Sequence, residues 1–339
     1  MTSFSPAMIS AKSLGAMPMF AVRELGEKKT HQLLSDAGLV ERFVTERNGY
    51  IPEYSLCAFI ERVSRELGED QLGLLFAPFL TVADYGAWGD YVLSAPDLRT
   101  ALKRAQQEMK LHSSADRVEF VIYGNLVSYA YKFGLKSHSS YQDIAFSAVA
   151  SMLSIPRHYL GQNWSPAKIE FDFPKSQKSG MAEEVFGCPV SFGGSSLRLL
   201  FDTSVLSTPN SPNHSIQSTT RHDIIRERST PPEDILASVD AVVHLHVADG
   251  GASLERLAQA TGVGPRRLQR HLAKQGTGFR EVLAKARMER AVELLELKGN
   301  SVATVSEALG YNEPGNFSRA FTQFFGASPT KYLKGRDRL

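Results

Sequence analysis

The pattern that most constrains the fold is found twice in the last hundred residues, where a short helical stretch, a glycine turn and a second helical stretch follow one another. In the first copy, Ser253 can cap a helix that ends at Gly262, and Pro265 can begin the next helix. In the second copy, the turn begins at Gly310 and the following helix at Pro314. Two helices joined by such a turn, the second with one apolar and one polar edge, are typical of a helix-turn-helix unit.

The second helix of each unit is predicted to carry polar side chains opposite its apolar edge. In the first unit, Leu268 and Leu272 lie four residues apart and form the apolar edge. In the second unit, the residues expected to be buried are Phe317, Ala320, Phe321 and Phe324. The residues expected to face duplex DNA are Arg266, Gln269, Arg270 and Lys274, and then Asn316, Ser318 and Arg319.

Some of these side chains suit base contacts and others suit phosphates. Arg can bind guanine through two hydrogen bonds in the major groove, and Gln or Asn can bind adenine in the same way. Base contacts are therefore expected from Arg270 and Gln269 in the first unit and from Arg319 and Asn316 in the second. Phosphate contacts, which position a protein without specifying sequence, are expected from Lys274, Arg280, Lys331 and the backbone N–H groups near Ser328.

One long amphipathic helix, over residues 279–297, is predicted between the two units. At ~1.5 Å per residue it would be about 28 Å long, and successive major-groove faces of B-DNA lie ~34 Å apart. Such a rod could place two recognition helices in consecutive major grooves.

The charge distribution agrees with a DNA partner. Residues 250–339 hold 15 Lys and Arg against 8 Asp and Glu, whereas residues 1–249 carry a net negative charge. A basic domain on an acidic body indicates a polyanionic partner. Either unit alone could be an ordinary helical hairpin, and the Arg-rich edge a solvated helix face, but two units in the basic region favour DNA.

The first two hundred residues have mixed helical and strand periodicity, which predicts an α+β domain. A hairpin is predicted around Gly124-Asn125, since these residues suit a tight turn. The other predicted elements are helices over 53–67, 97–111 and 140–160 and strands over 168–173 and 191–202.

We predict an N-terminal domain over residues 1–206, a linker over 207–232 and an all-α C-terminal domain over 233–339. The linker is rich in Ser, Thr, Pro and Asn and contains a short helical stretch at 221–228.

Several other classes of protein are disfavoured. The chain has no apolar run of the ~20 residues that a membrane span needs, and no secretory signal is expected at its start. No P-loop, nucleophile elbow or other catalytic motif is found, so neither an enzyme nor a cofactor is expected. His244 and His246 lie in an apolar segment and suggest core or capping roles rather than a metal site.

Two rival functions are compatible with a DNA-binding domain. A DNA-alkylation repair protein would need an activated cysteine, but Cys57 lies in an apolar helix and Cys188 precedes a proline. An architectural DNA binder would not need an acidic N-terminal domain of some two hundred residues. The chain contains only two cysteines, which also fits a reducing cytoplasm.

The C-terminal pattern closely resembles the AraC family of transcription regulators. The residues that carry the resemblance are Leu257-Ala258, Arg266, Leu268, Arg270, Gly276, Thr277, Phe279, Arg287, Ala291, Leu309-Gly310-Tyr311, Phe317-Ser318-Arg319-Ala320-Phe321, Gly326 and Ser328-Pro329. The resemblance implies that the second helix of each unit enters the major groove. The positions that it implies face the DNA are Arg266, Arg267, Gln269 and Arg270, and then Pro314, Gly315, Asn316, Ser318 and Arg319. The chain departs from the family at Gly264, where Ser is frequent, and at Pro314-Gly315, which offers no side-chain donor to the second half-site.

The N-terminal region resembles, more weakly, the effector domain of ornithine-utilisation-type regulators, through Gly73-Leu74-Leu75 and the stretch from Gly86 to Leu102. This resemblance implies a small-molecule effector, homodimerisation and, for a transcription regulator, RNA polymerase as a further partner. Three aromatic residues near the Gly-rich stretch could line the effector pocket or could instead be ordinary core residues: Tyr85, Trp88 and Tyr91.

Overall fold

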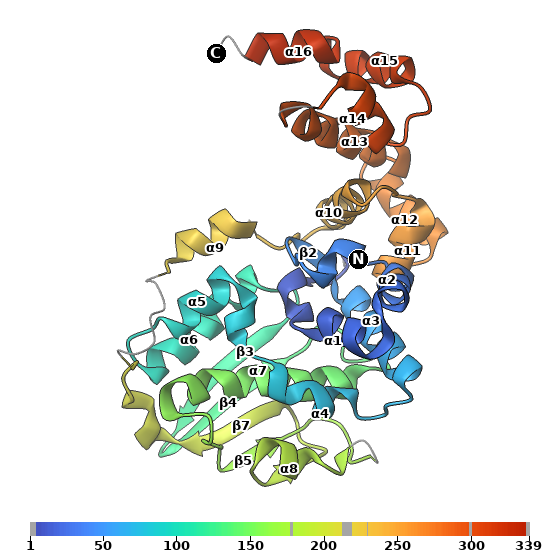
Figure 1. Ribbon diagram of the computed structural model, residues 1–339. Helices are drawn as coiled ribbons and strands as arrows, with labels where there is room; N and C mark the ends of the chain where they lie inside the picture. Colours follow the sequence, from blue (N-terminus) through green and yellow to red (C-terminus); the bar gives the residue numbers. More distant parts are fainter. Residues whose placement is uncertain (1–4, 177–178, 212–218, 229, 298–299, 337–339) are drawn as a thin grey trace.

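The computed structural model describes residues 5–176, 179–211, 219–228, 230–297 and 300–336 (Figure 1). An α+β region forms the N-terminal part, and a row of helices forms the C-terminal part that extends from one side of it. Both predicted fold classes are therefore confirmed.

The N-terminal region contains a five-stranded sheet with the order β3-β4-β7-β5-β6. Its strands are β3 (Arg117–Tyr123), β4 (Leu126–Lys132), β5 (Lys168–Glu170), β6 (Val190–Ser191) and β7 (Leu197–Asp202). The β5–β6 pair is parallel, and the other pairs are antiparallel. The sheet is open, and β3 forms one of its edges.

The β3–β4 hairpin and a long helix form the centre of this region. Gly124 has a φ of 57°, as the predicted tight turn requires. The helix α7 (Tyr141–Leu160) packs against the sheet, and the Phe146 ring centroid lies 5.0 Å from that of Phe171. The prediction of a helix over 140–160 is thus confirmed.

A second, helical layer precedes the sheet in the chain. It contains α1 (Met17–Leu25), α2 (Glu27–Asp36) and α3 (Glu53–Leu67), together with the antiparallel pair β1 (Met8–Ser10) and β2 (Tyr50–Pro52). The helix α3 has the bounds that its apolar spacing predicts. The remaining α-helices of this region are α4 (Leu72–Phe76), α5 (Ala87–Leu93), α6 (Leu98–Glu108) and α8 (Ala182–Phe186).

The described part of the predicted linker is packed on the N-terminal region. The helix α9 (Arg221–Arg228) lies beside α5 (Figure 1), and Ile224 is buried in the N-terminal core. Arg221 pairs with Glu108 at 3.0 Å, and the Ala87 N–H donates to Glu227 Oε2. These contacts attach the described segment before residue 229 to the first domain.

The C-terminal part is helical throughout its described residues, with α10 (Ile235–Ala248), α11 (Leu254–Thr261), α12 (Pro265–Lys274), α13 (Phe279–Glu296), α14 (Val302–Ala308), α15 (Pro314–Phe325) and α16 (Pro329–Arg336). The prediction that Phe324 is buried is wrong, because its side chain is 48% exposed. Phe321, Phe325 and Tyr332 pack together where α15 meets α16, with ring centroids 4.6–5.5 Å apart. This packing leaves Phe324 at the rim.

Candidate DNA interface and buried cavity

The first helix-turn-helix unit is built by the local signals that its sequence contains. Ser253 accepts a hydrogen bond from the Arg256 N–H at 3.1 Å and so caps α11. Gly262 ends the helix with a φ of 65°, a conformation that favours glycine. Pro265 occupies the first position of α12, where a missing N–H breaks no helical hydrogen bond.

The helix α12 presents the predicted basic edge to solvent. Leu268 and Leu272 are fully buried and attach the helix to the C-terminal core. The residues on the opposite edge are exposed, as the predicted contact residues of the first unit need to be: Arg266, Arg267, Gln269, Arg270 and Lys274. Desolvation, and then the neighbouring cations Arg267, Lys274 and Arg270, lower the pKa of His271 on the same helix.

The second unit has the same architecture with a sparser polar edge. Phe317 and Phe321 are buried, and Pro314 begins α15. Exposed positions are Pro314, Gly315, Asn316 and Arg319, whereas Ser318 is half-buried. The guanidinium of Arg319 donates to Asn316 Oδ1, so the two side chains expected to contact bases hydrogen-bond to each other.

The helix α13 joins the two units. Its 18 residues correspond to about 27 Å, close to the predicted rod. It packs against α10 at one end and α14 at the other, and Ala286 and Ala291 are fully buried. A continuous helix with one face buried in this way fixes the two units relative to each other.

The first unit is docked on the N-terminal region through α11, which lies beside α2 and α3 (Figure 1). Ser55 Oγ on α3 donates to the Ala260 carbonyl at 2.9 Å, and Gln259 donates to the Asp36 carbonyl at 2.6 Å. His246 Nε2 donates to the Gly38 carbonyl at 2.8 Å. No sequence signal predicted this contact.

Two glycines allow the docked surfaces to approach closely. A Cβ on Gly38 would lie 2.5 Å from Ala260 Cα, and a Cβ on Gly262 would lie 2.5 Å from the Tyr54 ring. Both distances are below 3.0 Å, so the Ala260 backbone or the Tyr54 ring would have to move to make room for the added Cβ. The side chains of Met8 and Tyr50 complete the contact by packing into the C-terminal core.

The docking contact is expected to weaken in acid. Burial lowers the pKa of His246 from 6.5 to about 4; the hydrogen bond to the Gly38 carbonyl opposes this decrease, and Arg256 contributes to it. Once undocked, the imidazole returns to water and its ordinary pKa. The undocked state therefore binds more protons between pH 6.5 and 4, and docking loses up to about 1.4 kcal/mol per pH unit as the pH falls through this window.

Hydrogen exchange at residues 257–263 measured at pH 7.5 and 5.5 checks this expectation. Exchange corrected for its intrinsic pH dependence should increase at pH 5.5 in the native chain. His246→Gln keeps an N–H donor but cannot titrate, so it should remove the difference. An equal increase in both proteins would show that another group is responsible.

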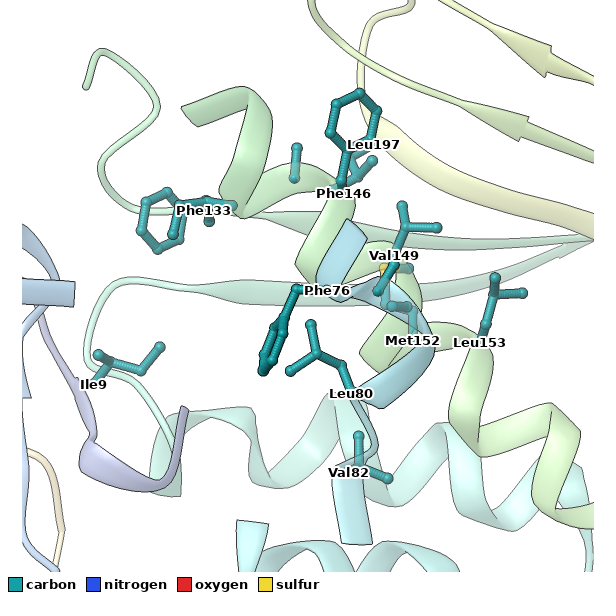
Figure 2. Close-up of a cluster of buried hydrophobic side chains, with 14 of the residues drawn as sticks. Ile9, Phe76, Leu80, Val82, Phe133, Phe146, Val149, Met152, Leu153 and Leu197 are labelled. Atoms are coloured by element: carbon teal, nitrogen blue, oxygen red, sulfur yellow. The ribbon is translucent and has the colours of Figure 1, made fainter. Parts of the chain in front are cut away.

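A buried cavity of about 90 Å³ lies in the N-terminal region. Its walls come from α3, α7, strand β4 and the segments around residues 76–88 and 109–112. Figure 2 shows Ile9, Phe76, Leu80 and Met152, four of the lining side chains, within one buried apolar cluster. The cavity is thus enclosed by elements that are far apart in the sequence.

Two of the three predicted effector residues line this cavity. Tyr85 and Trp88 do so, whereas Tyr91 lies outside the lining, beneath the guanidinium of Arg104 at 4.4 Å from the ring centroid. The structure adds His112, whose ring stacks on Tyr85 with centroids 4.8 Å apart. Nothing in the sequence around His112 predicts that this side chain lines a cavity.

The structure bears on two of the disfavoured chemistries, an activated cysteine and a metal site. Burial raises the pKa of Cys57 to about 12 and that of Cys188 to about 11, which is the opposite of thiol activation. Within the described ranges, no cluster of three or more His, Cys, Asp or Glu side chains could hold a metal ion. His244 instead pairs with Glu289 at 2.6 Å.

Comparison with known families identifies both halves of the chain. Residues 29–210 match the model of the arabinose-binding N-terminal domain of AraC transcription regulators, and residues 257–335 match a helix-turn-helix domain. The chain belongs to the AraC family of transcription regulators. It is therefore a DNA-binding regulator with an N-terminal effector-binding domain.

Individual relatives of this regulator cover different parts of it. The ornithine utilization regulator of Pseudomonas aeruginosa is 24% identical over 274 residues, which are 78% of this chain and 79% of the relative. The crystal structure of CdpR from the same species covers 81% of this chain and 91% of its own, at 21% identity and a TM-score of 0.39. The DNA-binding domain of AdpA, solved with a target DNA, covers 30% of this chain and 94% of its own, at 28% identity and a TM-score of 0.27.

No described helix of the regulator has the length and apolar character needed to cross a membrane.

Proposed function

We propose that the regulator reads two DNA half-sites with α12 and α15, and that the two helices contribute unequally. Arg270 and Gln269 make the base contacts of the first half-site, supported by Arg266 and Arg267 on the same exposed edge. This exposed edge, held by the buried Leu268 and Leu272, is the observation that carries the proposal.

The contacts of α15 with the second half-site mainly add affinity and fix the position of the protein on the duplex, and they contribute less to sequence discrimination. The helix α15 begins with Pro314 and Gly315, neither of which has a side-chain donor. Its two candidate base-contacting groups, Asn316 and Arg319, hydrogen-bond to each other and must separate to contact bases independently. Fewer independent donors mean less discrimination between sequences.

Selection of bound duplexes from a random pool by the full chain tests this proposal. We expect a bipartite sequence with half-sites about 10 base pairs apart, because α13 sets the spacing of the two units. One half should be more strictly selected than the other. Recovery of unrelated duplexes would contradict the proposal.

Lys274 is proposed to contact a phosphate, so Lys274→Ala should act mainly through salt dependence. The side chain is exposed at the end of α12, and in this position its ammonium group could contact a DNA phosphate without meeting a base edge. The slope of log K against log salt should become shallower by about 0.9, with base preference unchanged. Fluorescence anisotropy titrations at four salt concentrations measure both; an unaltered slope would exclude the contact.

The cavity is proposed to be the effector site, connected to the first DNA-binding unit through α3. Leu56 and Ile60 of this helix line the cavity, while Tyr54 and Ser55 contact α11. A shift of α3 around a ligand would therefore change the docking of α11. Strand β1 offers a parallel connection, because Ile9 lines the cavity and Met8 packs in the C-terminal core.

Further parts of the function rest on the family and on the surface of the sheet. We propose a homodimer in which the exposed apolar residues at the tip of the edge hairpin, Val121, Ile122, Tyr123 and Leu126, take part. Sedimentation of the native chain and of Tyr123→Asp tests the dimer, which the variant should dissociate.

The regulator is also proposed to act on promoter DNA in the cytoplasm, with RNA polymerase as a partner and without catalysis of its own.

A further inference from the structure

The lining of the cavity contains no formal charge. Of the 23 residues that surround it, none is Lys, Arg, Asp or Glu, and most are aliphatic, aromatic or Met. An ion placed in such a site would lose its hydration without gaining a partner of opposite charge. The cavity therefore disfavours a ligand that carries both an ammonium and a carboxylate group.

Most of the polar groups in the lining are already engaged within the protein. Tyr85 hydroxyl pairs with Ser151 Oγ at 2.9 Å, and Ser13 Oγ pairs with His112 Nε2 at 2.8 Å. A third pair joins the lining to a buried carboxyl group, since the Tyr131 hydroxyl donates to Asp116 Oδ2 at 2.6 Å. A ligand that used the donor or acceptor already engaged in one of these pairs would break an internal hydrogen bond.

Two hydroxyl groups of the lining stand apart from these pairs. Ser147 Oγ on α7 is buried and has no hydrogen-bond partner among the described residues. The Tyr129 side chain on β4 is 2% exposed, and burial alone, with no contribution from a hydrogen bond, raises the pKa of its hydroxyl. A buried hydroxyl without a partner is unfavourable, so a ligand group that bonded to one would be held by it.

The size of the space limits the ligand further. The cavity of about 90 Å³ is smaller than the apolar protein cavity of about 150 Å³ that holds one benzene ring, so a ligand larger than about one ring would require the walls to move. Tyr85, Trp88 and His112 form an aromatic cluster in the lining, with ring centroids 4.8–6.2 Å apart, and such a wall suits an aromatic ligand.

We propose that the cavity binds an uncharged, mainly apolar molecule of about one ring, with a single hydrogen-bonding group that meets Ser147 or Tyr129. This inference rests on the proposed role of the cavity as the effector site, and it names the ligand class. A sugar or an amino acid, whose several polar groups would remain unpaired in this lining, is excluded.

Titration calorimetry of the full chain with four probes tests the inference. Toluene and p-cresol differ by one hydroxyl group, and L-arabinose and L-ornithine represent the excluded classes. We expect the first two to bind, p-cresol about fivefold more tightly, and the other two not to bind. A hydrogen bond to a buried neutral group contributes an effect of this size.

Two variants show where the probes bind. Ala148→Phe fills the cavity from α7 and should abolish both interactions. Ser147→Ala is a smaller change that should preserve folding. If Ser147 is the partner of the ligand hydroxyl, Ser147→Ala removes the preference for p-cresol and leaves the affinity for toluene unchanged. If Tyr129 is the partner, Tyr129→Phe removes that preference instead.

Arabinose or ornithine binding that Ala148→Phe abolishes would overturn the ligand class and leave the effector site in place. Absence of binding by toluene and p-cresol, or binding that none of these variants alters, would also overturn the inference. DNA binding, measured separately on selected duplexes, tests the proposed DNA-binding function independently.

Discussion

Arg270→Ala is expected to weaken binding to the selected DNA by about 1–3 kcal/mol, or about 5- to 150-fold, and to relax base preference at one position. The side chain is exposed on α12, two residues after the buried Leu268 that fixes the helix. Its loss therefore removes a base contact without disturbing the core. Anisotropy titrations against a panel of single-base substitutions measure both effects.

A matched variant separates base recognition from charge. Arg23→Ala removes the same charge from α1, where the side chain is 65% exposed and far along the chain from either helix-turn-helix unit. It should leave affinity and preference unchanged. If Arg270→Ala lowered the affinity for every duplex of the panel equally, Arg270 would be a phosphate contact and not a base contact.

Gly38→Ala is expected to separate the first DNA-binding unit from the N-terminal region. The new Cβ would lie within 2.7 Å of three atoms of Ala260 on α11, and a helix backbone cannot yield as a flexible side chain can. We expect hydrogen exchange at residues 257–263 to increase at least about tenfold, which corresponds to about 1.4 kcal/mol of lost docking free energy. The radius of gyration should increase as well.

The positive φ of Gly38 imposes its own strain, which a control must remove. Gly68→Ala places the same residue at a φ of 64°, close to the 72° of Gly38, but its Cβ has nothing within 4 Å. Both variants should lose about 1–3 kcal/mol from backbone strain. Only Gly38→Ala should open the contact, and equal exchange at 257–263 in the two variants would contradict the docking account.

The helix-turn-helix units could be predicted because their signals are local. A capping Ser253, a left-handed Gly262 and a Pro265 at the first helical position each act within a few residues, and the structure contains all three. The burial of Leu268 and Leu272 follows from a spacing of four residues. Phe324 fits the same periodicity but is exposed, because α16 packs against Phe321 and Phe325 instead.

The cavity and the docking contact depend on long-range packing, which periodicity does not contain. Tyr85, Trp88 and Tyr91 are close in sequence, yet α5 directs only the last of them away from the cavity. His112 and Ser147 join the first two from other elements. Gly38 and Ala260 are likewise separated by most of the chain, so their contact could be recognised only in three dimensions.

The unequal contribution of α12 and α15 is the central claim, and the energy of every base substitution across the selected site tests it most directly. A cleavage reagent attached at position 273, which is exposed on α12, would mark the half-site that this helix occupies. We expect substitutions there to cost about 1–3 kcal/mol each and those in the other half to cost clearly less. Equal costs in the two halves, or larger costs in the half contacted by α15, would contradict the account.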